Sequence, residues 1–192
     1  MLQKADFELA DLVDPRLHNI ICYFAAKTKY LTEKRLQKLI YTAELYYIEK
    51  FCKRLTNIRF KNYNYGVWSP DVADANICLD GICLNIKEEE TTGGHLASFI
   101  ELMEEHPFEL TEDEIRVLDK VLEDWKFRTT DELVGFTKST LPWEESNFGE
   151  DVDLDGYIEE CELENNFFSN KEIMEELERI EKEETFVPLD EI

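Results

Sequence analysis

The sequence predicts a mainly α-helical domain with a small β hairpin or sheet, an α+β fold. A long stretch without proline or glycine, residues 32–55, predicts a central helix, and further capping motifs start helices later in the chain. An Asp-Gly pair between short apolar runs predicts a hairpin. With 43% hydrophobic residues, the 192-residue chain can build one core. We expect a lead-in over 1–14, a domain over 15–168, and an acidic C-terminal helix and tail over 169–192.

The first helix of the domain starts at Pro15, with its apolar face formed by Leu17, Ile20, Ile21 and Phe24. His18 and Cys22 lie four residues apart on it and so share a face. Two ligands do not make a metal site, so we interpret them as a histidine at a helix edge and a cysteine in the core.

The central helix begins after Thr32, which can cap its first turn. Its apolar residues fall on two faces, so we expect it to be packed on at least two sides. A single polar stripe remains, made of Arg35, Lys38, Thr42, Glu49 and Lys53.

An extended segment follows over residues 58–65, Gly66 breaks it, and Ser69-Pro70 starts a short helix. The run ICLDGICL, residues 77–84, predicts a hairpin turning at Asp80-Gly81 and placing Cys78 opposite Cys83. Such a pair is either a redox switch or two small buried hydrophobes. Residues 87–95 have the composition of a polar loop.

Two capping motifs start the remaining helices of the domain, at Thr111 (the capping box TEDE) and at Thr129 or Thr130, and the second helix ends before Pro142. A further capping box at Ser169 starts the acidic C-terminal helix. Its narrow apolar stripe, Ile173, Leu177 and Ile180, suits either docking on the domain or binding a partner.

The net charge of −23 is unevenly distributed. Residues 144–192 hold 19 acidic and 3 basic residues, a net of −16, whereas residues 27–61 hold 10 basic and 3 acidic residues, a net of +7. The total disfavours direct nucleic-acid binding and suits a basic partner. No apolar run is long enough to cross a membrane, and the five cysteines form no zinc-type pairs, so we expect a cytoplasmic protein with reduced thiols.

Two blocks of the chain resemble the Panacea domain family, the SocA-like antitoxins. Leu36, Lys38, Leu39 and Tyr41 match its KLxKLxY helix, and Gly66, Ser69, Pro70 and Val72 match its aromatic-glycine turn. A second block matches at Glu132, Leu133, Thr137, Pro142 and Trp143. The chain departs from the family with Val67 in place of proline and Lys138 in place of histidine. The resemblance covers roughly residues 15–168.

A calcium-loop pattern runs over residues 151–162, DVDLDGYIEECE. It gives candidate ligands Asp151, Asp153, Asp155, Tyr157 and Glu162, with Gly156 at the sharp turn. The preceding segment makes a poor entering helix, and so acidic a region produces such matches by chance. The family resemblance instead places a last core helix here.

The resemblance implies a non-catalytic, antitoxin-like protein that binds and neutralises a cognate protein toxin, by occlusion or by delivery for degradation. No nucleophile, metal or phosphate-loop motif argues for an enzyme, and no cofactor is expected, calcium being the one candidate. We place the partner contact at Gly66, Trp68, Ser69 and Asp71 and on the stripe Ile173, Leu177 and Ile180. The alternatives are an acidic nucleic-acid mimic or phage-type inhibitor of a basic host protein, and a calcium-binding module.

Overall fold

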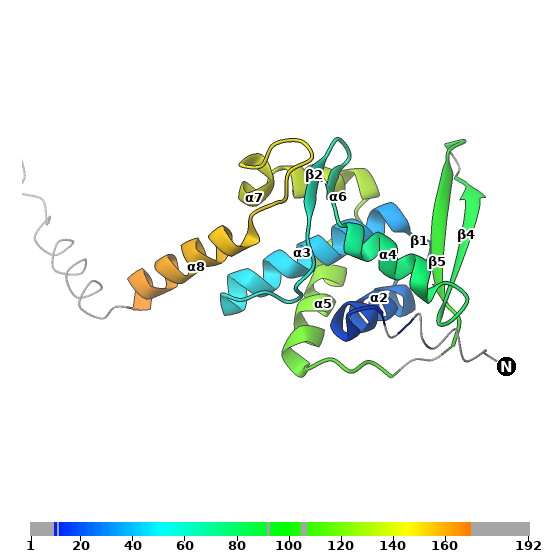
Figure 1. Cartoon of the computed structure of the whole chain (residues 1–192), viewed down its shortest axis with the longest axis horizontal. Helices are drawn as coiled ribbons and strands as arrows, with labels where there is room; N and C mark the ends of the chain where they lie inside the picture. Colours follow the sequence, from blue (N-terminus) through cyan, green and yellow to red (C-terminus); the bar gives the residue numbers. More distant parts are fainter. Residues whose placement is uncertain (1–9, 11, 92, 105–106, 170–192) are drawn as a thin grey trace, which may run out of the picture.

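The computed structural model describes residues 10, 12–91, 93–104 and 107–169. Figure 1 shows α3 in the middle of the molecule, with the β4–β5 ribbon at one end and α8 extending from the other. The mainly helical fold with a small antiparallel sheet is confirmed. The elements are α2 (Pro15–Lys27), β1 (Leu31–Thr32), α3 (Glu33–Phe51), β2 (Lys61–Tyr63), β3 (Gly66–Trp68), α4 (Pro70–Leu79), β4 (Leu84–Glu90), β5 (Leu96–Leu102), α5 (Glu112–Trp125), α6 (Thr130–Lys138), α7 (Leu141–Glu144) and α8 (Leu154–Ser169).

Helix α3 is the central element, as its two apolar faces predict. It packs against α2, α5, α6 and α8 and against the strands β1, β3 and β5. The Thr32 side chain accepts a hydrogen bond from the Arg35 amide at 3.3 Å and so caps the N-terminus. The helix ends earlier than predicted, because Cys52 adopts a left-handed conformation (φ 48°) that closes its last turn.

The predicted polar stripe of α3 is only partly exposed. Lys38 and Thr42 are 3% and 0% exposed. The polar stripe predicts that this side of the helix faces solvent, but β3 and α6 pack on it. The Thr42 hydroxyl donates to the carbonyl of Lys38 at 2.8 Å, which satisfies it within the helix. The helix is therefore surrounded on more of its circumference than its hydrophobic pattern indicates.

A buried carboxylate, Glu44, fixes the chain that leaves α3. Its oxygens accept hydrogen bonds from the Arg54 guanidinium at 2.6 Å, the Leu55 amide at 2.9 Å and the Thr56 hydroxyl at 2.6 Å. The side chain is fully buried, and a carboxylate in such a place is tolerated only with this many donors. These bonds hold residues 54–56 against the helix and direct the chain towards β2.

The sheets differ in part from the prediction. Strand β2 lies within the expected extended segment, and Gly66, expected as a break, begins β3, which pairs back on β2 as a short hairpin with Tyr63 opposite Gly66. The predicted hairpin over 77–84 is wrong, since residues 77–79 belong to α4 and Gly81 (φ 75°) closes a tight turn after it. The spacing of Val72, Ala75, Asn76 and Leu79 buries one helical face and carries α4 through the apolar run.

The actual hairpin is β4–β5, which turns within the segment whose composition predicts a polar loop. Its strands pair from Leu84 with Leu102 to Glu90 with Leu96, and β1 adds to the other edge of β5. Most of β4 is exposed and charged, so it lacks the apolar alternation that identifies a half-buried strand. Cys78 and Cys83 are consequently not cross-strand partners.

The later helices follow their capping signals. Both predicted caps form reciprocal capping boxes, Thr111 with Glu114 before α5 and Thr129 with Glu132 before α6. Helix α8 begins at Leu154 and contacts α3, as expected of a last helix after a variable loop. In the part of the chain that the structure covers, no helix has the length and hydropathy needed to span a membrane.

Candidate functional site

The helix motif over residues 36–41 and the aromatic-glycine turn meet in the second turn of α3. The Lys38 ammonium donates to the carbonyl of Val67 in β3. The neighbouring Gln37 side chain donates to the Ser69 carbonyl at 3.1 Å and accepts from the Ser69 amide at 2.8 Å. A side-chain amide paired in this way with a peptide group replaces a missing strand partner. The short β2–β3 hairpin is therefore held on α3 by polar side chains of the helix.

Gly66 lies where this hairpin approaches α6. Its φ of 84° is in the left-handed region, which residues with a Cβ atom rarely adopt. A Cβ atom at this position would lie 2.9 Å from the Thr137 hydroxyl and 3.3 Å from Cε of Lys38. Thr137 is itself fully buried, so its side chain has little space into which it could move away from such a Cβ atom. Both the conformation and the packing require glycine.

The four predicted partner-binding residues of this turn lie together, but two of them are buried. Ser69 is fully buried and caps α4 by accepting from the Val72 amide at 3.4 Å, and Gly66 is buried against α6. Trp68 is half-buried and forms an edge contact with the Tyr63 ring at 5.5 Å. Asp71 retains some exposure and accepts from the Arg59 amide at 2.7 Å.

Trp68 and Asp71 are thus the two residues of the set that are accessible to a partner, and the buried Gly66 and Ser69 position them. Their contact with a partner stays a prediction. The other three predicted contact residues, Ile173, Leu177 and Ile180, lie outside the described residues.

The predicted calcium ligands have other neighbours. Asp151 pairs with Lys61 at 2.7 Å, and the Asp153 side chain accepts from the Gly156 amide at 2.9 Å. Asp155 lies 3.7 Å from the Arg54 guanidinium. Residues 154–162 are helical, so Tyr157 and Glu162 rise along α8 instead of closing a loop. Residues 151–162 therefore do not form the predicted calcium loop in this structure. Whether they bind calcium stays a prediction.

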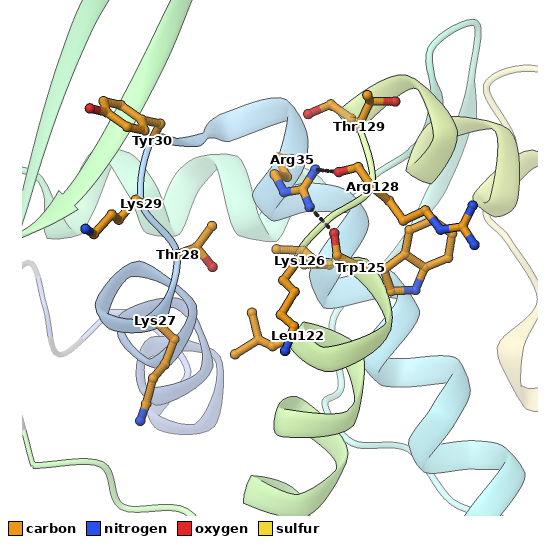
Figure 2. A pocket seen from close by; sticks show the side chains of 12 residues that line it. Lys27, Thr28, Lys29, Tyr30, Arg35, Leu122, Trp125, Lys126, Arg128 and Thr129 are labelled. Carbon is orange, nitrogen blue, oxygen red and sulfur yellow. Dashed lines mark hydrogen bonds between the residues drawn. The ribbon is translucent and has the colours of Figure 1, made fainter.

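A basic pocket of about 510 Å³ lies between the end of α2, the start of α3 and the α5–α6 connection (Figure 2). Arg35 lies at its back, where its guanidinium donates to the carbonyls of Trp125 at 2.6 Å and Arg128 at 3.0 Å. Burial lowers the pKa of Arg35 from its ordinary value. The lining residues of the pocket are Lys27, Thr28, Lys29, Tyr30, Arg35, Leu39, Leu122, Trp125, Lys126, Arg128, Thr129 and Thr130.

The lining holds five cationic side chains and no acidic one, in a protein of net charge −23. Tyr30, which lines the pocket, is 85% exposed, and Phe127, adjacent in sequence to the lining residues Lys126 and Arg128, is 89% exposed. The Lys126 ammonium lies 5.0 Å from the centre of the Phe127 ring. Exposed aromatic and arginine side chains are the types that dominate protein–protein contacts. This surface suits a carboxylate- or phosphate-bearing group.

The sequence alone did not reveal this pocket. The excess of basic residues over 27–61 was visible, but Lys126 and Arg128 come from a connection about ninety residues away. One signal was available, the run of basic and aromatic residues just before the Thr129 cap.

The departures from the family motif also have structural roles. Val67, in place of proline, is fully buried and offers its carbonyl to Lys38. Lys138, in place of histidine, donates to the carbonyl of Asn64 and lies 5.7 Å from the centre of the Trp143 ring. The Lys138 side chain therefore adds a contact between the β2–β3 hairpin and α6, whereas the Val67 carbonyl that Lys38 binds would also be present in proline.

Comparison with known proteins agrees with these motifs. The family described as antitoxin SocA-like, Panacea domain, matches residues 36–144, more than half of the chain. The matched region runs from the first turn of α3 to the end of α7 and contains the Lys38–Val67 contact, Gly66 and Thr137. No curated protein and no solved structure shows significant similarity to the chain. The chain belongs to the SocA-like antitoxin family with a Panacea domain.

Proposed function

We propose that this protein is a non-catalytic antitoxin that binds and neutralises a cognate protein toxin in the cytoplasm. The observation that carries the proposal is the family match over residues 36–144. The match covers the interlocked α3, β2–β3 and α6 unit, which is built from structural hydrogen bonds and close packing. Such a unit suits a rigid platform whose edges meet a partner.

The partner contact would combine two surfaces of opposite charge. One is the acidic C-terminal end, whose net charge of −16 over residues 144–192 favours a basic toxin. The other is the basic pocket with the exposed Tyr30, which favours an acidic segment of the same partner. Trp68, at the end of β3, and Asp71, in the first turn of α4, complete the proposed contact. Opposed charges on one protein fix the orientation of the partner as well as attract it.

The neighbouring reading frame in the native host supplies the natural candidate for the toxin. Expressed alone, that frame should stop growth, and co-expression with this chain should restore growth. A truncation after residue 168 tests the acidic end, and Trp68→Ala with Asp71→Ala tests the turn. Failure of the full chain to restore growth, with both proteins expressed and folded, would contradict the proposal.

The net charge of −23 favours one other function, mimicry of a nucleic acid. An acidic protein of this kind would occupy the nucleic-acid-binding surface of a basic host protein, and salt would release it. Recovery of a DNA- or RNA-binding protein as the bound partner, displaced by competing nucleic acid, would favour this second function over the first.

A further inference from the structure

Three metal-ligating side chains from two distant parts of the chain converge beside α2. The sulfur atoms of Cys22 and Cys83 lie 3.7 Å apart, and the Cys83 sulfur lies 3.5 Å from Nε2 of His18. All three ligand atoms lie within 4.8 Å of one another. No other group of three or more such side chains this close occurs among the described residues.

The backbone fixes the ligands from both sides. His18 and Cys22 occupy neighbouring turns of α2, whose start is held by Asp14, which accepts from the amides of Arg16 and Leu17. Cys83 lies in the turn that joins α4 to β4, where its amide donates to the Leu79 carbonyl at 3.2 Å. Its own carbonyl accepts from the Met103 amide at 2.9 Å, which ties the turn to the end of β5.

Two of the three ligand–ligand distances match those of a tetrahedral zinc site, and the third is within 4.8 Å. Zinc lies ~2.3 Å from thiolate sulfur and ~2.05 Å from imidazole nitrogen. At tetrahedral angles, these bond lengths place two sulfurs about 3.8 Å apart and a sulfur and a nitrogen about 3.5 Å apart. The observed 3.7 Å and 3.5 Å agree with both values. The two sulfurs are also well beyond the ~2.05 Å of a disulfide bond.

We propose that His18, Cys22 and Cys83 bind a zinc ion, as the three protein ligands of a tetrahedral site whose fourth position is open to water. Two thiolates and an imidazole favour zinc over the hard cations magnesium and calcium. His18 and Cys83 are half-buried, so the ion has a route from solvent, while Cys22 is fully buried.

Zinc at this position would join α2 to the α4–β4 turn and the end of the β4–β5 hairpin. In the described structure, the reduced sulfurs already contact each other across this junction. Binding to the folded chain alone would raise the melting temperature, by roughly 5–10 °C at a zinc concentration one hundred times Kd. We therefore expect the ion to stabilise this junction whether or not the toxin contact forms.

The test uses the reduced, chelator-treated full chain, titrated with cobalt(II) and then zinc. We expect one equivalent of cobalt to give the visible absorption of tetrahedral coordination and the near-ultraviolet bands of thiolate ligation, with zinc displacing it. Cys83→Ser should abolish both spectral features and the rise in melting temperature, and His18→Gln should weaken binding at least tenfold. Cys78→Ser, a half-buried cysteine of α4 outside the cluster, is the matched control and should bind normally.

Several results would overturn the proposal. One is that zinc binds equally to wild type and to Cys83→Ser, because the acidic surface alone would then account for it. Another is the absence of thiolate bands in the chelator-treated wild type. If oxidation joins Cys22 to Cys83, seen as the loss of two hydrogens by mass, and no metal binds the reduced form, the cluster is a redox pair instead. Circular dichroism of the metal-free variants establishes that each is folded before it is scored.

Discussion

The Lys38 ammonium on α3 donates a hydrogen bond to the backbone carbonyl of Val67 in β3 and so joins the helix motif to the aromatic-glycine turn. The side chain is only 3% exposed and has no carboxylate as its hydrogen-bond partner. Burial, with smaller contributions from the charges of Lys34 and Lys138, lowers the pKa of Lys38 to about 8. Lys38 therefore lies at a position where burial in the folded state destabilises its charged form.

This lowered pKa predicts that stability rises with pH in the weakly alkaline range. Between pH 8 and 10.5 the unfolded chain holds a proton at Lys38 that the folded chain has released, so raising the pH favours folding. Below pH 8 both states are protonated and the effect is constant. From pH 7.5 to 9.5, wild type should gain about 1–2 kcal/mol of unfolding free energy relative to Lys38→Met.

Urea denaturation at several pH values measures this difference. Lys50→Met, on the exposed surface of the same helix, is the control and should follow the wild-type profile. Parallel profiles for wild type and Lys38→Met would show that the buried amine does not titrate in this range.

Gly66→Ala should destabilise the protein by about 2–4 kcal/mol, through left-handed backbone strain and overpacking against Thr137. Gly149 is a matched control, because it has the same φ of 84° and no neighbouring atom within 4 Å of the place where a Cβ would lie. Gly149→Ala should cost about 1 kcal/mol, for the backbone alone. Equal losses for the two variants in urea denaturation would mean that packing at Gly66 contributes nothing.

Glu44→Gln should cost about 3–5 kcal/mol, since it leaves Arg54 without its buried carboxylate and presents an amide to the donors of residues 55 and 56. Glu49, five residues further along α3, accepts from the Tyr157 hydroxyl at 3.2 Å but is exposed. Glu49→Gln should therefore cost less than about 1 kcal/mol. A loss for Glu44→Gln no larger than this would contradict the role assigned to the buried network. Thermal or urea unfolding measures both.

The basic pocket should contribute to partner binding. Reversing two of its charges, with Lys29→Glu and Lys126→Glu, should weaken the toxin complex at least tenfold and reduce its salt dependence. The control makes the same change in net charge elsewhere, with Lys87→Glu on β4 and Arg116→Glu on α5, both exposed. If both double variants weaken the complex equally, net charge rather than the pocket controls binding. Calorimetry at two salt concentrations separates the cases.

Local signals in the sequence predicted most of the fold. The caps at Thr32, Thr111 and Thr129 depend on contacts within three residues, so the sequence contains all the information needed to place them. The prediction for residues 77–84 failed because a short apolar run fits both a strand and the end of a helix. The Asp80-Gly81 turn was located correctly, but the helix before it and the exposed charged strand after it were not recognised.

The site was predicted less completely, because its contacts join distant residues. Lys38 was assigned to solvent, since its carbonyl partner is 29 residues away in β3. His18 and Cys22 were recognised as neighbours on one helix face, whereas Cys83 joins them from 61 residues beyond Cys22. Gly66 and Ser69 were singled out through the family motif, which carries information on tertiary contacts that helical periodicity does not, and the contact of Trp68 and Asp71 with a partner stays a prediction.

The most direct test of the antitoxin proposal is isolation of the complex from the native host. The tagged full chain, co-expressed with the adjacent reading frame, should retain a small protein in a fixed stoichiometric ratio, and that protein alone should arrest growth. Its loss on truncation after residue 168 would assign the contact to the acidic end, and its retention would assign it to the domain. Recovery of no growth-arresting partner, or of only nucleic-acid-binding proteins released by salt, would contradict the proposal.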